Sequence, residues 1–92
     1  MSDEQIMALI INYLFRRRCW GGKYKTTQKV IRYLGQDVLG DGKEVTRCLD
    51  ELIKRGWVIA WKKGDTISLN TRYKKEIMNH KRQYDSNEMF FV

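Results

Sequence analysis

Proline is absent from this 92-residue sequence, and histidine occurs once. Because no proline interrupts a helix or marks a turn, the seven glycines must divide the chain into its elements. The segments between them have the lengths of single helices and strands. The sequence has no internal repeat, low-complexity stretch or Pro/Ser-rich linker. It therefore predicts one domain over residues 1–84, followed by a tail over 85–92 that docks on this domain or on a partner.

Long apolar runs are also absent. The longest, residues 6–11, is far shorter than the roughly 20 apolar residues that a membrane span requires. Residues 1–4 are acidic where a signal peptide is basic, so we expect a cytoplasmic protein with no membrane partner. In a reducing cytosol the two cysteines are expected to be free thiols, with Cys48 in the core and Cys19 at a helix end where it can be exposed.

One histidine and two separated cysteines leave little material for metal binding or catalysis. The sequence has no CxxC or HxxxH pair, whereas a structural zinc site needs about four ligands. It has no glycine-rich phosphate loop of the GxxxxGK[ST] type. The carboxylates are scattered among lysines, which is typical of surface ion pairs. We therefore expect no metal, no cofactor and no enzymatic activity.

What the sequence does have is positive charge. Lysine and arginine number 18 against 11 acidic residues, for a net charge of +7. Residues 16–32 contain seven basic and no acidic side chains, and residues 62–82 contain seven basic and two acidic ones. Such an excess either serves solubility or indicates a polyanionic partner: nucleic acid, acidic lipid or an acidic protein surface. The arginines at 16–18 either contact phosphate or only complement the dipole of the helix that they end.

Hydrophobic periodicity predicts a first helix over residues 2–18, with Ser2 and Gln5 forming a capping box. A second apolar face, which includes Ile11 and Phe15, makes this helix either buried on two sides or part of a dimer interface. A short strand is expected over 24–26. Thr27 is then expected to cap a second helix that Gly35 ends.

Asp41 is expected to open a third helix over 41–55, and Gly56 to end it. Two segments rich in β-formers, 57–61 and 66–69, flank the polar loop 62–65, which predicts a hairpin. Apolar and polar residues alternate over 66–69, so we expect that strand to be buried on one face. A fourth helix should follow to about residue 84.

The densest motif is an amphipathic helix ending in LxxLxxxGWV at residues 49–58 and leading into the hairpin. This pattern resembles the winged helix-turn-helix superfamily. Residues 68–77, SLNTRYKKEI, are similar to the strand-to-helix exit of small archaeal winged-helix proteins. The resemblance spans roughly residues 3–84 and implies an α+β fold with a three-helix core, a β-hairpin wing and a C-terminal fourth helix. The turn over 35–42 departs from it, being longer and richer in glycine than in many relatives.

The resemblance implies double-stranded DNA binding by a small transcriptional regulator of archaeal or archaeal-virus type. Helix 41–55 would lie in the major groove and hairpin 57–69 would be the wing. The candidate DNA-binding side chains on the third helix are Lys43, Thr46, Arg47, Asp50 and Lys54. Lys62 and Lys63 would contact phosphate from the wing tip. The basic segment of the second helix adds Lys25, Thr27 and Lys29.

Two other hypotheses remain open. Helix 41–55 has four basic and four acidic residues, which is compatible with a protein-interaction module of a larger complex. RNA or single-stranded DNA binding is favoured if Trp61 and Tyr24 are exposed side by side. A homodimer is expected, since a small chain usually binds symmetric sites as a dimer. Its candidate surface comprises Ile11, Phe15, Tyr84, Phe90 and Phe91.

Overall fold

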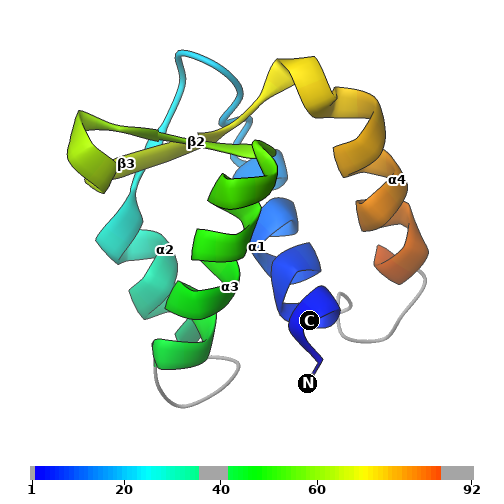
Figure 1. Cartoon of the computed structure of the whole chain (residues 1–92), viewed down its shortest axis with the longest axis horizontal. Helices are drawn as coiled ribbons and strands as arrows, with labels where there is room; N and C mark the ends of the chain where they lie inside the picture. The colour runs from blue at the N-terminus through cyan, green and yellow to red at the C-terminus, as the bar shows by residue number, and fades with distance from the viewer. Residues whose placement is uncertain (1, 36–41, 86–92) are drawn as a thin grey trace.

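The computed structural model describes residues 2–35 and 42–85 (Figure 1). Its helices and strands, in chain order, are α1 Asp3–Arg16, β1 Lys25–Thr26, α2 Thr27–Leu34, α3 Lys43–Arg55, β2 Val58–Trp61, β3 Thr66–Leu69 and α4 Lys74–Asp85. Short 3₁₀ turns, η2 Lys62–Gly64 and η3 Thr71–Tyr73, join β2 to β3 and β3 to α4. The described part of the chain is thus α+β, with four α-helices and a three-stranded antiparallel sheet. This layout is compatible with the predicted winged helix.

The sheet has the strand order β1-β3-β2, and the hairpin pairs Val58 with Leu69 and Trp61 with Thr66. β3 is therefore the central strand, and all four of its residues are buried. The prediction that only one face of this strand is buried is wrong. The segment after α1 pairs through its backbone with β3 at Leu69, and the buried Ser68 hydroxyl donates to the Gly21 carbonyl oxygen at 2.7 Å. A hydroxyl in this position is buried without losing its hydrogen bonds.

α1 lies at the centre of the molecule, in contact with α2, α3, α4 and β3. α1 is consequently buried on two sides, which is the first of the two alternatives given for its second apolar face. Ile11 is fully buried in this core, so the prediction that it contributes to a dimer surface is wrong. Phe15 and Tyr84 are half-buried. Phe90 and Phe91, and the predicted docking of the tail, lie outside the described residues.

The capping box at the start of α1 is confirmed. Ser2 Oγ accepts from the Gln5 N–H at 3.2 Å, and Gln5 Oε1 accepts from the Ser2 N–H at 2.9 Å. α1 ends at Arg16, two residues earlier than predicted, and the chain folds back toward β3. Leu69 N–H donates to the Cys19 carbonyl at 2.8 Å, which holds Cys19 in the core at 3% exposure. The expectation that Cys19 can be exposed is therefore wrong, and burial raises the pKa of its thiol.

Threonine and glycine residues cap α2 and α3. Thr26, rather than Thr27, is the N-cap of α2. α3 begins at Lys43 after Gly42, and the predicted opening residue, Asp41, lies outside the described residues. A Cβ on Gly42 would come within 2.8 Å of Ile31 Cγ2, so glycine allows α3 to start directly against α2. The other end is as predicted: Gly56 is the C-cap, with φ 83°.

Among residues 2–35 and 42–85, no helix combines the length and the apolar character that a membrane span requires.

Candidate nucleic-acid interface

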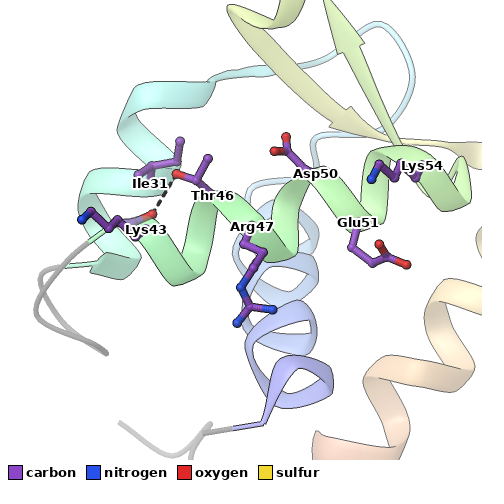
Figure 2. A pocket seen from close by; sticks show the side chains of 8 residues that line it. Ile31, Lys43, Thr46, Arg47, Asp50, Glu51 and Lys54 are labelled. Carbon is purple, nitrogen blue, oxygen red and sulfur yellow. Dashed lines mark hydrogen bonds between the residues drawn. The ribbon is translucent and has the colours of Figure 1, made fainter.

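The exposed side of α3 forms a shallow groove (Figure 2). Its buried side, which includes Val45, Leu49 and Leu52, packs into the core and fixes the rotation of the helix. The opposite side therefore faces outward. All five candidate residues of this helix line the groove, together with Ile31, Gly42 and Glu51: Lys43, Thr46, Arg47, Asp50 and Lys54.

The groove residues differ in how many hydrogen bonds and ion pairs their polar atoms make within the protein. The Thr46 hydroxyl donates to the Gly42 carbonyl at 2.7 Å, which leaves its lone pairs and methyl group at the surface. Asp50 and Lys54 are exposed and make no ion pair with the described residues. An unpaired carboxylate and ammonium one helical turn apart can contact an external ligand without first breaking an internal bond.

Arg47 is different, because acidic residues of the protein hold it. Its guanidinium donates to both carboxylate oxygens of Asp3 on α1, at 2.6 and 2.9 Å, and also to Glu44. In Figure 2 it points away from Thr46 and Asp50, toward α1. The hydrogen bond from Arg47 is the main reason that the pKa of Asp3 lies below its ordinary value. The same bond is the main cause of the raised pKa of Arg47. Both side chains are about half exposed, so a strong external anion can compete for this arginine.

The second group of candidate residues is at the tip of the hairpin. Lys62 and Lys63 are exposed, and both adopt positive φ angles, 50° and 58°. For non-glycine residues this left-handed conformation costs about 1–2 kcal/mol each. Gly64 follows with φ 92°, at which glycine has no such cost. The tip therefore needs contacts that hold it, and α2 supplies them.

Thr27, the first residue of α2, bonds the hairpin tip twice. Its hydroxyl donates to the Gly64 carbonyl at 2.6 Å, and its backbone N–H donates to the Asp65 carbonyl at 2.9 Å. The hydroxyl predicted to cap α2 or to contact DNA is thus engaged within the protein. Lys25 is half-buried on β1, and Lys29 is exposed on α2. The structure therefore joins Thr27 to the wing tip and places Lys25 opposite Ile67 on β3.

α2 connects the two groups. Its start is bonded to the hairpin tip, and Ile31 on the same helix lines the α3 groove. Figure 1 shows β2 and β3 running across the upper ends of α2 and α3. The groove and the wing tip are consequently parts of one rigid scaffold, held by hydrogen bonds and core packing.

The start of α1 carries a second carboxylate that joins three helices. Glu4 accepts from Arg55 Nη2 on α3 at 3.0 Å and from His80 Nε2 on α4 at 2.7 Å. These hydrogen bonds, first that from His80 and then that from Arg55, hold the pKa of Glu4 below its ordinary value. The His80 ring is buried, with its edge against Trp57. This cluster fixes α4 against α1 and α3, and it takes no part in the groove.

The aromatic residues on and beside the hairpin differ in exposure. Trp57 is half-buried and packs against the core. Trp61 and Tyr24 are exposed, at 39% and 44%. Lys62 Nζ lies 5.4 Å from the centroid of the Tyr24 ring, within cation–π range.

In the described part of the chain, no three histidine, cysteine or acidic side chains are grouped to hold a metal ion. Cys48 is buried as predicted, and desolvation raises the pKa of its thiol to about 11. A thiol with that pKa is protonated at neutral pH and is a poor nucleophile or metal ligand.

The partners of Asp3 and Glu4 could not be predicted from the sequence. Both acids lie in the first turn of α1, where negative charge suits the helix dipole without any further partner. Their actual partners, Arg47 and Arg55, are 44 and 51 residues away. Helical periodicity gives the face on which a side chain lies but not which distant helix packs against that face. No local signal could have indicated these pairs.

Comparisons with protein-family models, with curated proteins and with solved structures find no match.

Proposed function

We propose that this protein is a winged helix-turn-helix protein that binds double-stranded DNA. In this proposal the α3 groove faces the major groove of the duplex, and the hairpin tip lies on the phosphate backbone. The protein would act as a small transcriptional regulator that occupies its site, with no catalytic role of its own.

The observation that supports this proposal most is the convergence of the candidate side chains. The five residues on α3 are those to which the winged-helix resemblance gives a role in DNA binding, and they line one groove. The hairpin that follows ends in two exposed lysines, which α2 holds in place through Thr27. Groove and wing together make the two contacts by which such proteins bind a duplex: bases from the helix and phosphates from the wing.

The side chains on α3 suit base contacts. Asp50 can accept from the exocyclic amine of cytosine, and Lys54 can donate to the acceptor edge of guanine. The Thr46 methyl group can contact the methyl group of thymine. Arg47 joins them only if it exchanges Asp3 for guanine or phosphate. The near-neutral charge of α3 is consistent with this division, because the lysines of the wing tip would contact the phosphates.

The homodimer remains a prediction. Among the described residues its candidate surface is now Phe15 and Tyr84, since Ile11 is buried. Sedimentation equilibrium of the free protein tests it, and a monomer at every concentration would contradict it.

The experiment that tests the proposed function is a fluorescence-anisotropy titration of a generic labelled duplex at two salt concentrations. A single strand of the same sequence and heparin serve as controls for unpaired bases and for unspecific polyanion binding. We expect micromolar, salt-sensitive binding that favours the duplex. If no duplex binding occurs even at low salt, the proposal fails, and a protein-interaction module becomes the better hypothesis.

A further inference from the structure

Three large hydrophobic side chains are exposed in the described part of the chain: Tyr24, Tyr33 and Trp61. Tyr33 packs against Tyr13 of α1, with ring centroids 5.1 Å apart. Trp61 is the last residue of β2, and Tyr24 immediately precedes β1. They take no part in the α3 groove.

Strand alternation places Trp61 on the outer face of the sheet, and Lys62 links it to Tyr24. Val58, Ile67 and Leu69 are buried and belong to the face that packs on the helices. Trp61 pairs with Thr66, and Thr66 pairs with Thr26, so these three residues share the opposite, outer face. Tyr24 immediately precedes β1, and its ring centroid lies 5.4 Å from Nζ of Lys62, the residue after Trp61.

Two contacts of the side chains hold this arrangement. Trp61 Nε1 donates to the Ser68 hydroxyl at 3.0 Å, which fixes the indole across the outer face toward the middle of β3. Lys62, next in the chain to Trp61, extends its ammonium to within 5.4 Å of the Tyr24 ring centroid. A cation therefore lies over the Tyr24 ring, one residue along the chain from Trp61. The indole is also held in place before any ligand arrives, which lowers the entropic cost of binding.

The charge around these rings favours an anionic ligand. Residues 16–32, which include Tyr24, contain no acidic side chain. Lys23 and Lys25 flank Tyr24, and Lys62 and Lys63 follow Trp61. Aromatic faces beside lysines are the combination by which proteins hold unpaired nucleotides, since every base has a face that can stack and every nucleotide carries a phosphate.

We propose that the outer face of the sheet is a second nucleic-acid site, at which Trp61 and Tyr24 stack on unpaired bases and Lys62 contacts the adjoining phosphate. Stacking of this kind is indifferent to base sequence and to the 2′-hydroxyl, so single-stranded DNA and RNA both qualify as ligands. Trp61 and Tyr24 lie outside the α3 groove, and the site shares only Lys62 with the proposed duplex contact.

The test is a titration of the full chain with oligothymidylate and, in parallel, oligouridylate, followed by quenching of tryptophan fluorescence and by anisotropy of a labelled strand. The variants are Trp61→Ala, Trp61→Phe and Tyr24→Ala. Trp61→Phe keeps a stacking ring and loses the hydrogen bond to Ser68. Tyr33→Ala is the matched control, because it removes an equally exposed tyrosine from α2. Circular dichroism of each variant establishes that it is folded.

We expect both oligonucleotides to bind and Trp61→Ala to weaken binding roughly 5- to 150-fold, the range for the loss of one stacked base. Trp61→Phe should recover most of that loss, and Tyr33→Ala should bind as the wild type does. Binding of the duplex used above should be unchanged in Trp61→Ala. If the wild type binds single strands but not duplex, this inference stands and the proposed function fails.

Three results would overturn the inference. The first is no single-strand binding at all. The second is wild-type affinity for single strands in Trp61→Ala and Tyr24→Ala. The third is an equal loss of single-strand and duplex binding in Trp61→Ala, which would assign the indole to the wing contact with duplex.

Discussion

Arg47 in the α3 groove donates two hydrogen bonds to the carboxylate of Asp3, the first residue of α1. The pair brings an acidic side chain to the edge of a groove that we propose to bind DNA. A phosphate or guanine must compete with Asp3 for the same guanidinium. Asp3 is therefore expected to reduce affinity for DNA while contributing little to stability, since both partners are largely exposed.

The first prediction concerns this pair. Arg47→Ala should weaken binding to the preferred duplex roughly 5- to 150-fold if Arg47 contacts a base. Asp3→Asn should raise duplex affinity a few-fold, because it releases the arginine and removes a negative charge. Anisotropy titrations measure both. Unchanged affinity in Arg47→Ala would remove Arg47 from the interface, and weaker binding in Asp3→Asn would show that Asp3 positions Arg47 rather than competing for it.

The second prediction concerns the wing. Replacing Lys62 and Lys63 together by alanine should weaken binding to all duplexes alike and flatten the dependence of log K on log salt by about 2. Lys74→Ala with Lys75→Ala on α4 is the matched control, since it removes the same charge from another exposed segment. A salt slope that responds equally to both double variants would mean that total charge, and not the wing, determines affinity.

The third prediction concerns the bond that holds the wing tip. Thr27→Val keeps the shape of the side chain and loses the hydroxyl that donates to the Gly64 carbonyl. We expect the free energy of unfolding to fall by about 1 kcal/mol, as for the loss of one neutral hydrogen bond. Thr26→Val is the control, because Thr26 is exposed and makes no side-chain capping bond. Urea denaturation compares the two, and equal stability of both variants would contradict the account.

The fourth prediction is a pH dependence of stability. The pKa of Glu4 in the folded protein is lower than its ordinary value of 4.5, because His80 and Arg55 bond the carboxylate. Its contribution to stability is therefore fully present above pH 4.5 and is lost as the pH falls through the lower folded-state pKa. At pH 7, Glu4→Gln should cost about 1 kcal/mol or less, because the side chain is 44% exposed and screened by solvent.

Thermal melts of the wild type and Glu4→Gln between pH 3 and 7 should converge at the acid end. Glu51→Gln is the control, since Glu51 also faces Arg55, but at 3.9 Å. A stability difference for Glu4→Gln that stays constant over this pH range would show that the carboxylate charge does not matter.

The elements of this fold could be predicted because their signals are local. The capping box at Ser2, the left-handed Gly56 and the alternation of β-formers each depend on a few neighbouring residues. The face of α3 could also be predicted, since helical spacing determines which residues lie opposite the apolar stripe. The candidate residues of α3 therefore line one groove, because the helix forms over nearly the predicted range.

Features that depend on packing could not be predicted. The position of β3 as the central strand, which buries Ser68, results from pairing with β1, a strand of two residues. The use of Thr27 to hold Gly64 joins residues 37 apart. The occupation of Arg47 by Asp3 depends on how α1 crosses α3. In each case tertiary structure, and not the neighbouring sequence, determines the partner of the residue.

An amide NMR titration of the protein with a short duplex locates the duplex-binding surface residue by residue. We expect the shifted resonances to map to residues 42–54 along the α3 groove and to residues 62–65 at the wing tip, with α4 unaffected. Shifts confined to the basic α4, with the groove unchanged, would contradict this expectation, because binding would then follow positive charge and not the geometry of α3 and the wing.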